Sequence, residues 1–248
     1  MPGGQQRKFS VWISWSSIKK GILGAVLLAV MIGIIAYDMP TARTVNYWSL
    51  PLSGKVIAID AGHGGPDGGA VSRSGLIEKD INLSVALYLR DYLQQAGAIV
   101  VMTREGDYDL AQEDTKGYSK RKTEDLKQRV RSIEEKGADL FVSIHMNSIP
   151  SNRWSGAQTF YYPGSEKNKA LAERVQGELR ATLENTDRVA KTANTIYLLK
   201  VLKMPSVLVE VGFLSHPQES LLLGEDVYQR KVATSIYRGI LRYSSEQP

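Results

Sequence analysis

Short apolar runs alternate with longer amphipathic segments after residue 54, and this pattern limits the folds open to the chain. The apolar runs predict buried strands, and apolar residues spaced three or four apart predict helices. Strands separated by helices favour a single α/β domain, with a twisted, largely parallel or mixed sheet of about six strands covered by helices on both faces. Strands are expected over residues 55–60, 98–103, 140–144, 157–162, 195–199 and 207–213; helices over 80–95, 123–136, 166–183 and 227–243; and a surface loop over 107–122.

An uncharged run extends from Gly21 to Ala36 and continues into Tyr37. As a helix it rises about 25 Å, slightly less than a bilayer core of ~30 Å, and the basic segment before it can lie at the interface. A cleaved signal peptide is an alternative, although Ile34 and Pro40 are poor residues before the two candidate cuts. A third alternative is that this run forms a buried core helix. We expect an uncleaved signal anchor, which places the rest of the chain outside the cytoplasm.

The chain therefore divides into four parts. Residues 1–20 form a basic N-terminal segment, residues 21–37 a transmembrane signal anchor, residues 38–53 a tether and residues 54–248 one globular domain. If the signal is cleaved instead, the globular domain is secreted.

Composition excludes several classes of site. The chain has no cysteine, which excludes disulfides, cysteine metal ligands and a cysteine nucleophile. Four of the 31 basic residues lie in residues 1–20, where there is no acidic residue, so the rest of the chain is almost neutral. The net charge of +5 therefore does not indicate nucleic-acid binding, and we expect none.

Four polar residues are expected near the carboxyl edge of the sheet, where open α/β sheets bind ligands. His63 and His145 follow two of the strands, Glu78 precedes the first helix, and Glu210 lies within an apolar strand. Two histidines and a carboxylate form a known ligand set for catalytic zinc, but each histidine has a structural role as its alternative. A carboxylate in an apolar strand suits a general base with a raised pKa; the alternative is an edge strand with Glu210 facing solvent.

Five motifs occur together in the order found in one enzyme family. The sequence resembles the zinc-dependent N-acetylmuramoyl-L-alanine amidases of the amidase 3 family over about residues 54–243. The motifs are DAGHGGPDGGA, EKDINL, MTRE, RVRSIEEKGADLFVSIHMNS and MPSVLVEVGFLSHPQE. Within that family, WSLPLSGKVIAIDAGHGGPDGGA, KGYSKRK and the short single-pass architecture are most similar to the spore-cortex amidases, which act in germination.

The resemblance implies a site and a reaction. It implies one zinc ion held by His63, Glu78 and His145, with Glu210 as the catalytic carboxylate, in a fold akin to zinc carboxypeptidases. The implied reaction is hydrolysis of the amide bond between N-acetylmuramic acid and L-alanine in peptidoglycan. The implied setting is the outer side of a membrane, such as the forespore intermembrane space, beside a deacetylase or a regulatory protein.

Other residues and other functions are weaker expectations. Arg104 either shapes a substrate groove or forms a structural salt bridge, and Asn147 is a candidate hydrogen-bond partner of the ligands. Asp67 is expected to fix its loop and His216 to start a turn or helix, neither binding metal. A zinc peptidase acting on cell-wall peptides and a non-catalytic wall-binding protein remain alternative functions.

Overall fold

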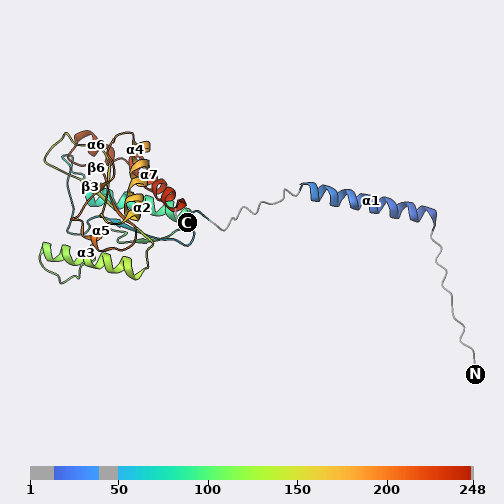
Figure 1. Cartoon of the computed structure of the whole chain (residues 1–248), viewed down its shortest axis with the longest axis horizontal. Helices are drawn as coiled ribbons and strands as arrows, with labels where there is room; N and C mark the ends of the chain where they lie inside the picture. Colours follow the sequence, from blue (N-terminus) through green and yellow to red (C-terminus); the bar gives the residue numbers. More distant parts are fainter. Residues whose placement is uncertain (1–13, 39–49, 247–248) are drawn as a thin grey trace, which may run out of the picture. The chain divides into compact units, whose positions relative to one another are not determined.

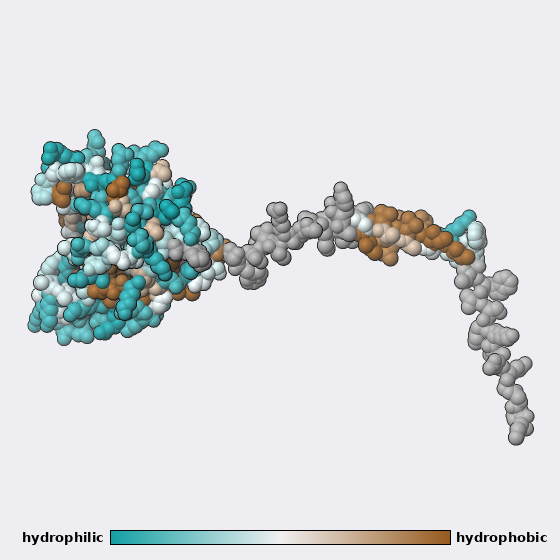
Figure 2. All heavy atoms as spheres, in the orientation of Figure 1, coloured by the Kyte–Doolittle hydropathy of each residue, from teal (hydrophilic) through white to brown (hydrophobic). Residues whose placement is uncertain are grey.

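The computed structural model describes residues 14–38 and 50–246. The chain divides into two units, Met1–Tyr47 and Trp48–Pro248 (Figure 1). Within the described part of the first unit, a helix, α1 (Trp15–Asp38), contains the whole of the predicted segment 21–37. Its segment Trp15–Gly33 is the one described helix that is long and apolar enough to cross a membrane, and Figure 2 shows its apolar surface. Residues 39–49 of the predicted tether lie outside the described residues.

The second unit is built on a six-stranded mixed sheet. The strand order is β2-β1-β3-β6-β4-β5, and every neighbouring pair is parallel except β4 with β6. The predicted α/β fold with a mixed sheet of about six strands is confirmed. The strands are β1 (Val56–Ala61), β2 (Ile99–Met102), β3 (Leu140–Asn147), β4 (Gln158–Tyr161), β5 (Lys191–Thr192) and β6 (Ser206–Phe213).

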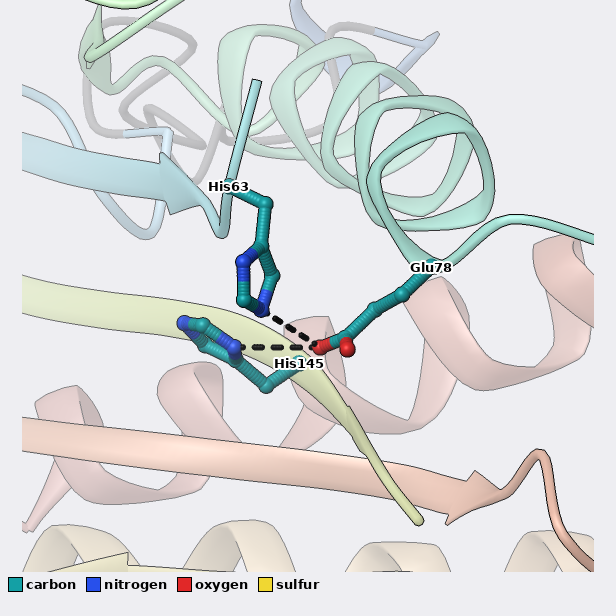
Figure 3. A group of neighbouring side chains, drawn as sticks. All are labelled: His63, Glu78 and His145. Carbon is teal, nitrogen blue, oxygen red and sulfur yellow. Dashed lines mark hydrogen bonds and ion pairs between the residues drawn. The ribbon is translucent and has the colours of Figure 1, made fainter. Parts of the chain in front are cut away.

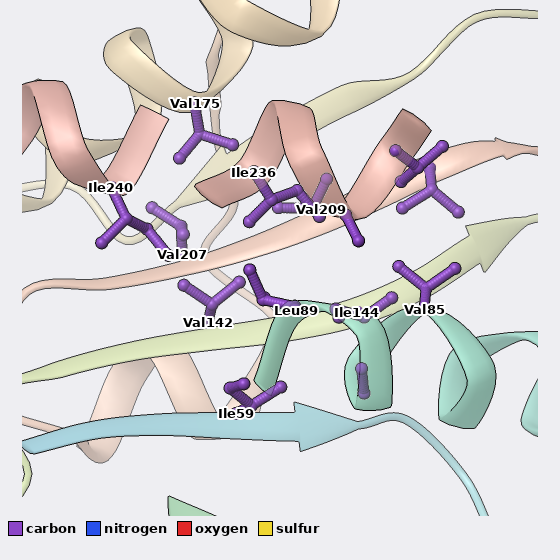
Figure 4. Close-up of a cluster of buried hydrophobic side chains, with 14 of the residues drawn as sticks. Ile59, Val85, Leu89, Val142, Ile144, Val175, Val207, Val209, Ile236 and Ile240 are labelled. Atoms are coloured by element: carbon purple, nitrogen blue, oxygen red, sulfur yellow. The ribbon is translucent and has the colours of Figure 1, made fainter. Parts of the chain in front are cut away.

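Helices cover both faces of this sheet, so its central strands are apolar on both sides. On one face Ile59, Val142 and Val209 pack with α2 (Glu78–Gln95), α4 (Glu166–Leu183) and α7 (Asp226–Ser245), as Figure 4 shows. On the other face Phe141 and Leu208 pack with α3 (Tyr118–Glu135) and α5 (Tyr197–Val201). A short helix, α6 (Pro217–Leu223), follows β6.

Two predicted elements are wrong. The run 195–199 was predicted as a strand, but residues 197–199 belong to the short helix α5, which begins after the N-cap Ile196. A short apolar run fits a strand or a helical turn, and Leu198 and Leu199 are both buried in the helical conformation. The last strand at this edge is β5 instead, two residues long. Helix α3 begins at Tyr118, inside the stretch predicted as loop, because polar side chains of its first turn have partners in neighbouring loops.

The folded unit also includes residues that the sequence assigns to the tether. Leu52 is fully buried in the core, and its backbone amide donates a hydrogen bond to the Ala96 carbonyl at 3.0 Å. The chain therefore enters the domain against the C-terminal end of α2.

Candidate metal centre

Three of the predicted residues converge at the carboxyl edge of the sheet. His63 follows β1, Glu78 is the first residue of α2, and His145 lies within β3, which runs beyond the predicted end (Figure 3). Oε1 of Glu78 lies 3.1 Å from Nε2 of His63 and 3.2 Å from Nδ1 of His145. One donor atom from each residue lies within 4.8 Å of the other two, which is close enough to hold a single metal ion.

The glycine-rich loop brings His63 to this position through an uncommon backbone conformation. His63 has φ 64°, in the left-handed region that non-glycine residues rarely adopt. Two arginines, each 1% exposed, hold the neighbouring carbonyls. Arg129 Nη2 donates to the His63 carbonyl at 2.6 Å, and Arg104 Nη2 donates to the Gly62 carbonyl at 3.0 Å. Such a conformation costs about 1–3 kcal/mol and persists because surrounding contacts enforce it.

Arg104 supports the loop that carries His63 and, within the described part of the chain, does not form the salt bridge that was its alternative role. Its guanidinium is buried and donates to the carbonyls of Ala61, Gly62, Lys79 and Gly106. No carboxylate pairs with it among the described residues. Arg104 is therefore a structural support of the ligand loop. Arg129 supports the same loop, and the sequence reasoning missed it, because an arginine in an amphipathic helix ordinarily indicates a solvated face.

Two glycines leave room for the ligand side chains. A Cβ atom on Gly62 would lie 2.3 Å from Cε1 of His145, and a Cβ atom on Gly69 would lie 2.6 Å from Oε2 of Glu78. Both distances are far below van der Waals contact. The loop therefore needs glycine at these positions to admit the ligand side chains.

Glu78 is buried but fully supplied with hydrogen-bond donors. Its Oε1 accepts from the amide of Met146 and its Oε2 from the amide of Ala70, both at 2.9 Å. Burial alone would raise its pKa, but hydrogen bonds with His145 and His63 outweigh burial and hold the pKa well below its usual range. Burial would lower the pKa of His63, but Asp67 and Glu78 raise it to about 9. Positive charge is therefore favoured between these side chains.

Glu210 lies beside the triad on the central strand β6. It is the register partner of His145 on β3 and of Gln158 on β4. The alternative of a solvent-facing edge strand is therefore wrong. Its Oε2 is buried and has no hydrogen-bond partner among the described residues. Burial raises the pKa of Glu210 to about 7, which suits a group that exchanges protons near neutral pH.

Asn147 and His216 are not brought into the triad. The Asn147 carbonyl accepts from the amide of Leu214 at 2.9 Å, and within residues 14–38 and 50–246 its side chain forms no hydrogen bond to the triad. His216 is the N-cap of α6, where its Nδ1 accepts from the amide of Glu219 at 3.1 Å. The helix-entry role predicted for His216 is confirmed.

Two imidazoles and a carboxylate are one of the ligand sets found in catalytic zinc sites, where a fourth position stays open to water or substrate. A family model for N-acetylmuramoyl-L-alanine amidase matches residues 57–242 and so spans the triad and Glu210. The chain belongs to the amidase 3 family. It is an N-acetylmuramoyl-L-alanine amidase, an enzyme that hydrolyses the bond between N-acetylmuramic acid and L-alanine in peptidoglycan.

Individual relatives agree with this assignment. The chain is 52% identical over 241 residues to the germination-specific N-acetylmuramoyl-L-alanine amidase of Bacillus subtilis, covering 97% of this chain and 98% of that one. The CwlD amidase of Clostridioides difficile, solved in complex with the GerS lipoprotein, is 41% identical with a TM-score of 0.76, covering 78% of this chain and all of that one. The catalytic domain of CwlV from Bacillus (Paenibacillus) polymyxa is 36% identical with a TM-score of 0.66, covering 78% and 99%.

Proposed function

We propose that the chain is a zinc-dependent amidase in which His63, Glu78 and His145 hold the ion and Glu210 is the catalytic carboxylate. The observation that carries this proposal is the convergence of the three donor atoms beside a Glu210 oxygen that has no hydrogen-bond partner within the described part of the chain. Donors about 2 Å from a tetrahedral ion lie a little over 3 Å apart. The spacing from Glu78 Oε1 to each ring nitrogen, 3.1 and 3.2 Å, fits that arrangement.

Bound zinc supplies Lewis-acid polarisation of the scissile carbonyl and lowers the pKa of water. The chain's own residues supply the rest. Glu210 removes a proton from the attacking water and delivers it to the L-alanine nitrogen as the amide bond breaks. Met146 and Ala70 hold Glu78 through their amides, so the ligand carboxylate does not rotate away. The products are a glycan strand without its peptide and a free stem peptide.

We infer a role in maturation of the spore cortex. Support comes from the high identity, over almost the whole chain, to an amidase named as germination-specific. The N-terminal helix suits a membrane anchor with the amidase outside the cytoplasm, in the forespore intermembrane space. A deacetylase acting on the same glycan, or a regulatory protein such as the lipoprotein bound to the Clostridioides difficile relative, is the partner class we expect.

Digestion of purified peptidoglycan tests the reaction. The amidase proposal predicts new L-alanine amino termini and muramic acid residues that have lost the whole peptide. A shortened stem peptide would indicate a zinc peptidase instead, and no released product would indicate a wall-binding protein. Zinc content, measured on the same sample, tests the metal independently of the products.

A further inference from the structure

Asp67 lies between the candidate ligand His63 and the first turn of α3. Its Oδ1 is 2.9 Å from Nδ1 of His63 and accepts from the Tyr118 hydroxyl at 2.8 Å. Its Oδ2 is 3.0 Å from Nζ of Lys122. The Gly69 amide also donates to Oδ1, at 3.1 Å, so the carboxylate fixes its own loop as the sequence predicts. The contact with His63 goes beyond that role.

The two ring nitrogens of His63 face different carboxylates. Nε2 lies 3.1 Å from Oε1 of Glu78, toward the other two donors, whereas Nδ1 lies 2.9 Å from Oδ1 of Asp67. Nδ1 is buried and is not aligned with Asp67 for a hydrogen bond, so among the described residues this nitrogen has Asp67 within reach but no hydrogen-bond partner. A neutral imidazole that binds a metal through Nε2 carries its proton on Nδ1 and donates it to a neighbour. A carboxylate at Nδ1 fixes both the tautomer and the plane of the ring.

We propose that Asp67 is a positioning residue that orients His63 for metal binding, and that Tyr118 and Lys122 make the first turn of α3 part of the same structure. The inference rests on the proposed ligand role of His63. It extends that proposal outward from the candidate ligand His63, first to Asp67 and then to Tyr118 and Lys122, which contact Asp67.

Metal binding at His63 and the contacts of α3 with Asp67 should stabilise each other. If the contacts of Tyr118 and Lys122 with Asp67 help His63 to hold a metal, a bound metal strengthens those contacts by the same free energy. The amide of Arg121 donates to the Gly117 carbonyl at 2.9 Å and so reports on the first turn of α3. Metal binding should therefore slow hydrogen exchange at the Arg121 amide.

Asp107 offers a matched control. It fixes the same glycine-rich loop, because its Oδ1 accepts from the Gly65 amide at 2.9 Å and its Oδ2 pairs with Nζ of Lys79 at 2.7 Å. It forms no contact with His63 among the described residues. If zinc is held less tightly only because the loop is loosened, removal of either carboxylate should have this effect. If zinc is held less tightly because the His63 ring loses its orientation, only removal of Asp67 should have it.

The experiment measures the rate at which zinc leaves the full chain into an excess of chelator. This rate reports on the loaded site, so protonation of the empty site does not affect it. Asp67→Ala should release zinc about 10- to 100-fold faster, the usual effect of losing the outer partner of a ligating histidine. Asp67→Asn keeps an acceptor oxygen and should show a smaller increase, while Asp107→Ala should release zinc at nearly the wild-type rate.

The outcomes separate this inference from the proposed function. Failure of the wild-type chain to bind zinc would reject the metal site itself. Zinc release from Asp67→Ala at the wild-type rate, or equally fast release from Asp107→Ala, would reject the positioning role of Asp67. Exchange at Arg121 that zinc slows in wild type but not in Asp67→Ala supports the link to α3, and unchanged exchange in the wild type rejects it.

Discussion

At the scale of single residues, the metal centre depends on backbone contacts behind it. His63 keeps its left-handed conformation because Arg129 and Arg104 hold the carbonyls around it. Arg129 in turn pairs with the buried carboxylate of Asp60 at 2.7 Å. Removal of one partner from such a pair leaves an unpaired buried charge. The ligand loop and the buried ion pair therefore form one structural unit.

The close approach of Gly62 to His145 predicts a large effect from one methyl group. Gly62→Ala should displace the His145 ring, because the new Cβ would lie 2.3 Å from Cε1. A displacement of about 1 Å at a reacting centre can reduce the rate about 100-fold. Gly177→Ala is the control, since Gly177 lies in α4 with nothing within 4 Å of an added Cβ. Zinc content and turnover should fall in Gly62→Ala only; wild-type values for both would contradict the steric argument.

The Asp60–Arg129 pair predicts a pH dependence of stability. Burial would raise the pKa of Asp60, but the charge of Arg129, helped by His145 and Ser143, holds this pKa at about 2, below the usual value of an aspartate. Because the folded-state pKa is the lower one, ionised Asp60 stabilises the fold above pH ~4. That contribution, about 2 kcal/mol, is lost as the pH falls towards 2.

Urea unfolding between pH 4 and pH 2 measures this contribution. Asp60→Asn should be less stable at pH 4 and should lack this part of the pH dependence. Asp226→Asn, which removes an exposed ion pair with Arg230, should retain it. Equal pH dependence in Asp60→Asn and wild type would show that Asp60 does not carry the effect.

At the residue scale, the sequence indicates the candidate site residues better than it indicates the residues that hold their loop in place. His63 and His145, which follow strands, and Glu210, which lies in an apolar strand, could be selected as candidates from their positions, whereas the ligand set that includes Glu78 is implied by the family resemblance. The positive φ of His63 and the inward direction of Arg129 could not be predicted from the sequence, because both depend on contacts between segments far apart in sequence.

At the scale of elements, register sets the candidate ligand His145 beside the proposed catalytic carboxylate Glu210. The parallel pairing of β3 with β6 sets His145 directly beside Glu210, so a shift of one residue would turn one of them to the opposite face. Periodicity predicts both strands because both are continuous apolar runs. The same criterion fails for α5, since five residues rich in apolar side chains fit a strand or a helical turn equally well.

The N-cap of α6 gives a prediction at this scale. His216→Ala removes the acceptor for the Glu219 amide and should lower the free energy of unfolding by about 1 kcal/mol. His216→Asn supplies another capping acceptor and should recover most of that loss. Both variants should retain zinc, which elemental analysis can measure. Loss of zinc from His216→Ala would contradict the ligand assignment.

At the scale of the whole molecule, the N-terminal helix contains a segment, Trp15–Gly33, that is long and apolar enough to cross a membrane. We expect residues 1–37 to remain on the mature protein, because Ile34 and Pro40 are poor residues before a signal-peptidase cut. N-terminal sequencing of the native protein from the membrane fraction measures this. A mature N-terminus between residues 37 and 46 would instead indicate a secreted enzyme.

In the proposed site, three residues bind the metal and a fourth, Glu210, transfers protons. Zinc content and turnover on purified peptidoglycan, measured on one sample of Glu210→Gln, test that division most directly. We expect a full equivalent of zinc and a rate reduced by at least about 10²–10⁴-fold, the usual contribution of a positioned proton-transfer group. Loss of zinc would make Glu210 a ligand, and full activity with zinc retained would remove it from the reaction.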